Sequence, residues 1–390
     1  MTIQVTKAEH DNQTSPRWMH WLNLIFNSLV IVGAGLMLTF FLASPTEISV
    51  SEITEIIDNR TVYLLVYVFG FVLLMGIFAI VGSIRKLSGK SNSINPKWIN
   101  LIFGLFITAG ILLIVLEQFF NYPDWLYALA TFLAVLTPAL FFLKLFSGRL
   151  LGKHLGRDAS VISFTANFSL PYIMIIQLLL VFIGVFVGMM VLLPNLITSS
   201  TIMQDLELLL ASPELIIISA VILVGIIAPI TEELFKTIAV WPLLGRKLSA
   251  REGYLAGMMS GFAFAVIEGG LYATQLALIS DGDLTTVLLG RMGGSLIHMF
   301  NGALIGWALA KGKQDRNHAR TIVIYIITMA IHALWNLIAV FSQTIPSLLE
   351  QSVNEVLSTG LLLGMSIVLF LAFVIFSRNV FKENKITEEI

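Results

Sequence analysis

The hydrophobic residues of this chain fall into long, nearly uninterrupted stretches that are separated by short polar loops. Ten stretches have about 20 or more residues each, the length that a helix rising about 1.5 Å per residue needs to cross a bilayer. We therefore expect an all-α polytopic integral membrane protein, a helix bundle with about ten transmembrane helices. The expected helices cover residues 19–43, 61–84, 98–120, 124–146, 170–193, 215–243, 252–279, 287–310, 321–341 and 356–377.

The composition agrees with a membrane protein and excludes several classes of function. Of the 390 residues, 57% are hydrophobic and only 12% are charged, which is too apolar for a soluble domain. The net charge of −1 gives no reason to expect a nucleic-acid partner. The apolar composition makes the lipid bilayer the expected surrounding. The chain has no cysteine, which excludes disulfides, thiolate metal sites and a cysteine nucleophile.

The loops between these stretches alternate in charge. Four loops are basic, at residues 85–97, 148–157, 245–251 and 311–320. Those at residues 44–58, 205–214, 280–283 and 350–355 are acidic or poor in lysine and arginine. Because basic loops stay in the cytoplasm, we expect a multi-pass protein of the cell membrane with both termini cytoplasmic. The polar N-terminal segment lacks an apolar core, so the first membrane helix is expected to direct insertion.

The two halves of the chain differ in the polar residues that their helices carry. We expect an accessory transmembrane region at residues 1–200, a core at residues 201–345, and a last helix with a cytoplasmic tail at residues 346–390. The ionisable and amide side chains inside the core helices are Glu232, Glu233, Lys236, Glu268, His298, Asn301, His332 and Asn336. An ionisable side chain near the bilayer centre costs about 2.5–3.5 kcal/mol on insertion scales, so this set marks the candidate functional region.

Four of these residues, on four consecutive helices, are expected at nearly the same depth. At about 1.5 Å per residue, Glu232, Glu268, His298 and His332 lie roughly 18–26 Å from the nearest basic loop. The middle of a membrane about 40–45 Å thick lies at a similar depth. The sequence therefore predicts that the four side chains meet.

Small residues indicate that two of the core helices pack closely. Glycines recur at intervals of four residues, at Gly253, Gly257 and Gly261 on one helix and at Gly302 and Gly306 on the next. This spacing places them on one face of each helix, where the lack of a side chain lets two backbones approach.

The acidic pair Glu232 and Glu233 precedes Lys236 by four and three residues, so either carboxylate can pair with the lysine. A structural ion pair would account for one glutamate and leave the other without a partner on its own helix. Two close carboxylates repel each other, which suits one of them to act as a general base.

The later polar residues allow a structural or a chemical role. Glu268 could pair with the lysine of the preceding helix, and His298 could be a core histidine bonded to Asn301. His332 and Asn336 are four residues apart on one helix face, where the amide could orient the imidazole or bind a substrate carbonyl.

These residues lie in short motifs that together resemble the PrsW family of intramembrane proteases. The motifs are "EELFK" (232–236), "FAVIE" (264–268), the helix with His298, and "HALWN" (332–336). Their order and spacing match the family across residues 215–340. The wider clan includes the CAAX prenyl proteases and the bacteriocin-processing enzymes.

The resemblance implies an intramembrane peptidase and assigns roles to individual residues. It implies that Glu232 activates water and that Glu233 is held by Lys236. It also implies that His332 and Asn336 bind the water or stabilise the oxyanion. At the position of Glu268 the CAAX enzymes have histidine, and glutamate is the residue of the PrsW-like proteins.

Two mechanisms remain open at this point, one with a metal and one without. Glu268, His298 and His332 match a His₂Glu ligand set for Zn²⁺ with an open fourth position for water. The sequence contains no HExxH motif, so a metal-free network around a glutamate-activated water is the alternative.

We expect an intramembrane endopeptidase that cuts a membrane-anchored protein or peptide. The resemblance alone suggests a regulatory target such as a membrane-tethered anti-sigma factor. A proton- or cation-coupled transporter is an alternative, because Glu and His residues near the midplane serve as relays. Transporters are often built from two related halves, and the Glu–His set has no counterpart in the first five helices. A non-catalytic sensor or scaffold is the third possibility.

Overall fold

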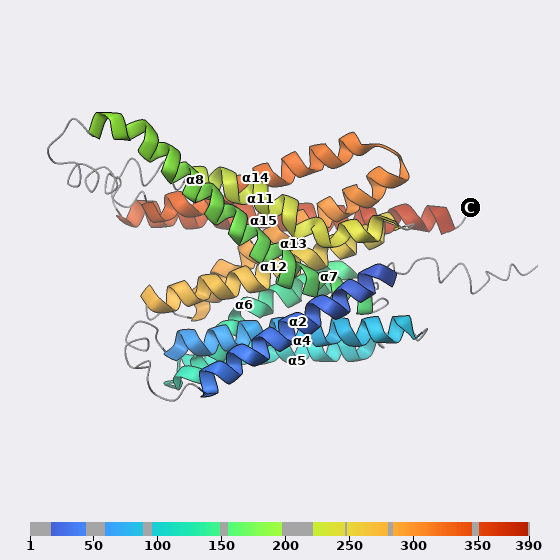
Figure 1. Cartoon of the computed structure of the whole chain (residues 1–390), viewed down its shortest axis with the longest axis horizontal. Coiled ribbons are helices and arrows are strands. Elements are labelled where there is room, and N and C mark those ends of the chain that lie inside the picture. The colour runs from blue at the N-terminus through green and yellow to red at the C-terminus, as the bar shows by residue number, and fades with distance from the viewer. Residues whose placement is uncertain are drawn as a thin grey trace, which may run out of the picture.

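The computed structural model describes residues 17–43, 59–88, 96–148, 155–196, 221–245, 248–279, 284–344 and 351–388. Within these residues all regular secondary structure is helical, which confirms the predicted all-α helix bundle (Figure 1).

The helices of the first half are α2 (Arg17–Ala43), α4 (Asn59–Leu87), α5 (Pro96–Glu117), α6 (Asp124–Ser147), α7 (Leu155–Phe164), the π-helix η1 (Thr165–Ser169) and α8 (Leu170–Leu196). The second half begins with the π-helix η2 (Leu223–Ile227), α11 (Ala228–Lys236) and the 3₁₀-helix η3 (Thr237–Gly245). It continues with α12 (Ala250–Ile279), α13 (Leu284–Gln314), α14 (His318–Thr344) and α15 (Gln351–Glu388).

Seven helical segments of the described residues are long and apolar enough to cross a membrane. They are Asn59–Arg85, Lys97–Glu117, Asp124–Ser147, Arg157–Gly184, Ala250–Ala273, His318–Ala339 and Gly360–Lys382. Each of the seven overlaps one of the ten predicted spans. The other three predicted spans overlap α2, the continuous segment from η2 to η3, and α13, and residues 215–220 lie outside the described part.

The predicted start of the fifth span at residue 170 was wrong. Helix α7 begins at Leu155 and continues through η1 into α8 without interruption. Polar residues of this continuous helix, such as Ser163 and Thr165, are buried against other helices. Ser163 donates a hydrogen bond to Asn27 of α2, and Thr165 donates one to Ser260 of α12 at 3.0 Å. Polar side chains that bond across helices in this way are compatible with a membrane interior.

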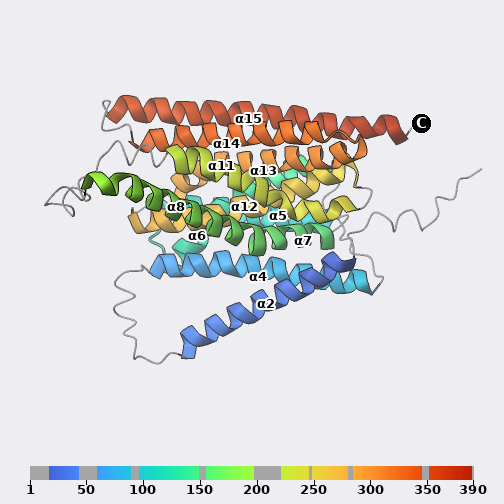
Figure 2. The ribbon, with the colours of Figure 1, turned by 45° about the horizontal axis from the view of Figure 1, so that its top comes forward.

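The bundle has α6, α12 and α13 at its centre. Figure 1 shows α2, α4 and α5 on one side of these helices, and Figure 2 shows α14 and α15 on the side opposite α2 and α4. The hydrophobic core is built largely from α6, α12 and α13, and α12 is buried along most of its length. The residues that carried the functional prediction lie on α11, α12, α13 and α14, in this central region and beside it.

Helices α12 and α13 pack through the glycines that the sequence singled out. A Cβ atom placed on Gly257 would lie 1.9 Å from the carbonyl oxygen of Gly302, and one on Gly253 would lie 2.4 Å from that of Gly306. At Gly261 the neighbour is the carbonyl oxygen of His298, at 2.2 Å. The close approach predicted from the spacing is confirmed, and it holds His298 against α12.

We predict that Gly257→Ala destabilises the fold although alanine is the better helix former. The methyl group would meet rigid backbone, and such overpacking costs about 1–3 kcal/mol. Chemical unfolding in detergent micelles measures the change. The matched control is Gly104→Ala on α5, where a Cβ meets nothing within 4 Å. Equal stability of the two variants would contradict the close packing of α12 and α13.

Candidate active site

The helix that carries the acidic pair changes its winding twice. The π-helix η2 leads into α11, and the 3₁₀-helix η3 follows it. In η2 the N–H of Ala228 bonds the carbonyl of Leu223, five residues earlier. The same pattern would pair the carbonyl of Val224 with residue 229, but Pro229 has no N–H. Asn336 of α14 supplies the missing donor, because its Nδ2 lies 2.9 Å from the Val224 oxygen.

Helix α14 packs directly on this π-helical turn. A Cβ on Gly225 would lie 2.6 Å from a methyl carbon of Leu337, so glycine makes room for the neighbouring helix. Together with the bond from Asn336, this contact sets the position of α11 relative to α14. The resemblance implied that Asn336 binds water or an oxyanion, and in the structure its amide holds the backbone of η2.

Glu233 is the centre of a fully buried charge cluster. Its Oε1 accepts hydrogen bonds from Lys236 Nζ at 2.5 Å and from Asn301 Nδ2 at 3.1 Å. The third partner is His332 Nδ1 at 2.8 Å. The side chains of Glu233 and Lys236 are both 0% exposed. The sequence allowed Lys236 to pair with either glutamate, and the structure pairs it with Glu233.

A second charge cluster lies on α12 and α13. Oε2 of Glu268 lies 3.0 Å from His298 Nε2 and 2.9 Å from a terminal nitrogen of Arg291. The suggested pairing of Glu268 with Lys236 is therefore wrong, because Lys236 bonds Glu233 and Arg291 is the cation at Glu268. Sequence reasoning missed Arg291. Its signal was a charged residue seven positions before His298, about two helical turns away on the same face.

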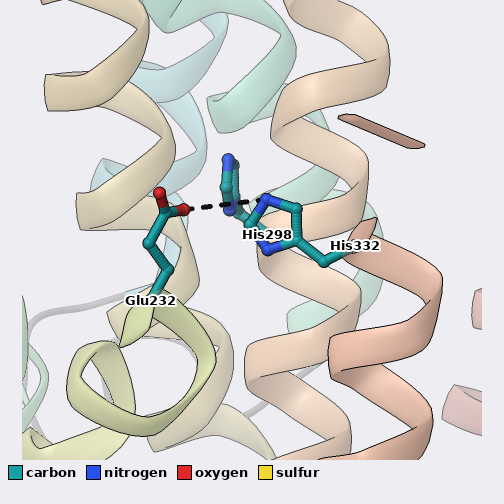
Figure 3. A group of neighbouring side chains, drawn as sticks. All are labelled: Glu232, His298 and His332. Carbon is teal, nitrogen blue, oxygen red and sulfur yellow. Dashed lines mark ion pairs between the residues drawn. The ribbon is translucent and has the colours of Figure 1, made fainter. Parts of the chain in front are cut away.

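Glu232, His298 and His332 bring one ligand-type atom each to a common point, with all of these atoms within 4.8 Å of one another. Figure 3 shows the Glu232 carboxylate facing the two imidazole rings. Its Oε2 lies 3.6 Å from His332 Nε2. All three residues are buried. Glu232 therefore reaches the two histidines from α11, while α13 and α14 supply the rings.

Two atoms at this point have no hydrogen-bond partner within the described part of the chain. They are Oε2 of Glu232 and Nδ1 of His298. The other carboxylate oxygen of Glu232 accepts a hydrogen bond from Gln177 Nε2 of α8 at 3.2 Å. Gln177 was not a predicted site residue, although its amide interrupts the apolar sequence of α8. A buried polar atom without a partner is costly, so this point suits a ligand.

The third member of the predicted metal set changes. The sequence grouped Glu268 with His298 and His332, and the structure groups Glu232 with them. The physical reason is Arg291, which draws Glu268 to the far side of His298. The number of residues between Glu268 and the nearest basic loop predicted its depth, but it could not predict which side chains of other helices lie next to it.

Two of the three side chains already have the spacing of ligands to a divalent metal ion. In a tetrahedral zinc site with bonds of about 2.0–2.2 Å, the ligand atoms lie roughly 3.3–3.6 Å apart. The 3.6 Å between Glu232 and His332 is within that range. Each histidine also has its other nitrogen engaged by a carboxylate, as metal-binding histidines usually do.

Comparison with known proteins gives one family. The family described as PrsW family intramembrane metalloprotease matches residues 176–377, just over half of the 390-residue chain. No curated protein and no solved structure matches the chain. The matched range begins one residue before Gln177 and contains every residue of the site described above.

We predict that Lys236→Ala destabilises the protein by about 3–5 kcal/mol, because it leaves the buried Glu233 carboxylate without its cation. Unfolding in detergent measures the loss. Lys144→Ala removes an exposed lysine of α6 and is the control. The double variant Lys236→Ala with Glu233→Gln should recover part of the loss, since neither charge remains. A Lys236→Ala protein as stable as the control would show that the pair is dispensable.

Proposed function

The chain belongs to the PrsW family of intramembrane metalloproteases, and we propose that it hydrolyses peptide bonds of membrane-anchored proteins or peptides at Glu232, His298 and His332. The observation that supports this site is the convergence of three buried side chains on a point where two polar atoms lack a partner. The described residues include seven helices that are long and apolar enough to span a membrane, which supports a substrate that reaches the site from the bilayer.

Glu232, His298 and His332 would hold the metal ion, and two imidazoles with one carboxylate suit Zn²⁺ with an open fourth position. A bound ion of this kind acts as a Lewis acid that makes water a better nucleophile and polarises the scissile carbonyl. The carboxylate has two oxygens, so Glu232 can be a ligand through one of them and accept a proton at the other.

The surrounding carboxylates fix which nitrogen of each histidine faces the site. Glu233 accepts the proton on Nδ1 of His332, which leaves the lone pair of Nε2 directed toward Glu232. Glu268 accepts the proton on Nε2 of His298, which leaves Nδ1 unprotonated. Both rings are thus held in a defined tautomer and orientation before substrate arrives.

Peptide hydrolysis needs a base for water and an acid for the leaving amine. We assign both tasks to Glu232, which takes a proton from the attacking water and passes it to the amine nitrogen as the bond breaks. Gln177 holds one oxygen of this carboxylate and thereby orients it. We assign Asn336 a positioning role, because it fixes the π-helical turn from which α11 begins.

We predict that Glu232→Gln lowers cleavage by at least about 10²-fold, the usual loss when a general base is removed. The substitution keeps the shape of the side chain, so the stability of the protein should stay close to that of the wild type. The measurement compares the membrane proteomes of cells that produce the wild type or the variant, followed by cleavage of the accumulated protein with purified enzyme.

Glu117→Gln, at the end of α5, is the matched control for this experiment. It should cleave like the wild type. If Glu232→Gln cleaves the same protein at the wild-type rate, Glu232 is not the base and the proposed chemistry is wrong.

We also propose that both termini are cytoplasmic, which the alternation of basic and acidic loops supports. The cysteine-free chain is a suitable background for single-cysteine labelling. Cysteines at Ser91 and Gln314 should react with an impermeant reagent only from the cytoplasmic side. A cysteine at Ser51 should react only from outside, and the reverse pattern would overturn the orientation.

A further inference from the structure

Arg291 is a nearly buried arginine that the proposed reaction does not yet use. Its side chain is 10% exposed and lies on α13, inside the predicted span 287–310. One terminal nitrogen donates to Oε2 of Glu268 at 2.9 Å, and the guanidinium carbon lies 5.8 Å from the centre of the Tyr272 ring. Burying an arginine in a membrane protein is costly, so its position calls for a cause.

Two glycines form the slot that holds the guanidinium group. A Cβ on Gly269 of α12 would lie 2.8 Å from Nε of Arg291, and one on Gly294 of α13 would lie 3.0 Å from a terminal nitrogen. An alanine at Gly269 would therefore displace the guanidinium, and one at Gly294 would push its terminal nitrogen by a few tenths of an ångström. At Gly290, one residue before Arg291, a Cβ meets nothing within 4 Å. The close contacts thus occur at two glycines that face the arginine and not at its nearest glycine neighbour.

The contacts of Arg291 repeat the order of groups found at Lys236. On one side of the site Lys236 bonds Glu233, which bonds His332. On the other side Arg291 bonds Glu268, which bonds His298. In each series a cation holds a carboxylate, and the carboxylate holds one nitrogen of a histidine whose ring faces Glu232.

The two series differ in burial, and the difference explains the need for Arg291. Glu233 is 0% exposed and is fixed by Lys236 and Asn301. The Glu268 side chain is 38% exposed. A carboxylate with that freedom can rotate away or be hydrated, and it would then stop orienting the histidine. A guanidinium on the same oxygen that His298 uses prevents this.

We propose that Arg291 is a positioning residue that fixes His298 for metal binding by holding Glu268 in place. The assignment rests on the proposed function, since it concerns the ion expected at Glu232, His298 and His332. Arg291 does not touch that point itself and acts only through Glu268.

The experiment measures the binding of Co²⁺ and Zn²⁺ to the purified full-length protein by competition with a chelator, together with the visible spectrum of bound Co²⁺. Arg291→Gln should weaken binding by up to about 10–100-fold, the typical effect of losing a direct partner of a metal-binding histidine, because Glu268 is that partner and would lose its anchor; it should also alter the spectrum. Arg291→Lys keeps the charge without the forked geometry, so it should fall between Arg291→Gln and the wild type.

A second variant, Gly294→Ala, tests the same contact between Arg291 and Glu268 without removing the charge of the arginine. Gly294→Ala should push the guanidinium away from Glu268 and weaken binding in the same direction as Arg291→Gln, and Gly290→Ala should leave binding unchanged. Arg60→Gln is the matched arginine control, because Arg60 pairs with Asp124 at 3.0 Å and its guanidinium carbon lies 4.6 Å from the ring centre of Tyr127. It should bind both ions like the wild type.

The outcomes separate the two proposals. If the wild type binds the ions and the folded Arg291→Gln and Gly294→Ala proteins bind them equally well with an unchanged Co²⁺ spectrum, the role of Arg291 is refuted and the proposed function stands. If Arg291→Gln does not fold, Gly294→Ala decides in the same way. If the wild type binds neither ion, the metal site is wrong and the role of Arg291 is wrong with it.

Discussion

The fully buried ion pair between Lys236 and Glu233 is the interaction on which the rest of the site depends. A carboxylate in this interior is tolerated only when a cation and hydrogen-bond donors surround it. Glu233 receives them from three helices, because Lys236 lies on α11, Asn301 on α13 and His332 on α14. The single oxygen Oε1 therefore ties together the helices that carry Glu232 and both histidines.

Around this pair, ion pairs hold the two histidines in place, and the carboxylate of Glu232 lies near both rings without a cation bonded to it in the described residues. One nitrogen of each histidine contacts a carboxylate, His332 that of Glu233 and His298 that of Glu268. Each of these carboxylates also pairs with its own cation. Glu232 has neither lysine nor arginine bonded to it, and its contacts are the amide of Gln177 and the ring of His332. The pairing of most charges explains how the core carries several ionisable residues in a membrane, and it fits the proposed role of Glu232 as the reacting carboxylate.

The sequence predicted the parts of this arrangement that depend on position along a helix. The long hydrophobic stretches located the helices, and the distance from basic loops predicted one level for Glu232, His298 and His332. A spacing of three residues allowed the pair of Glu233 with Lys236. Glycine spacing located the contact between α12 and α13. Each of these properties is local, so one segment of sequence is enough to read it.

The parts that sequence reasoning missed depend on which helix faces which. Depth does not say toward which neighbour a side chain turns, so the sequence grouped Glu268 with the two histidines, whereas the carboxylate that lies near both rings in the structure is that of Glu232. Arg291 and Gln177 acquire their importance only from partners on other helices. The polar start of α7 and the π-helical turn at η2 were missed for the same reason, since their hydrogen bonds go to residues that are distant in the sequence.

Anomalous diffraction at the zinc edge, from crystals of zinc-loaded protein, tests the central claim most directly. That claim is that Glu232, His298 and His332 bind one metal ion, while Glu268 does not bind the ion and instead bonds the other nitrogen of His298. The account predicts a single strong peak within about 2.0–2.2 Å of an atom of each of the three residues, with Glu268 bonded to His298 and Arg291. A peak that has Glu268 as a direct ligand and leaves Glu232 outside bonding distance would contradict it.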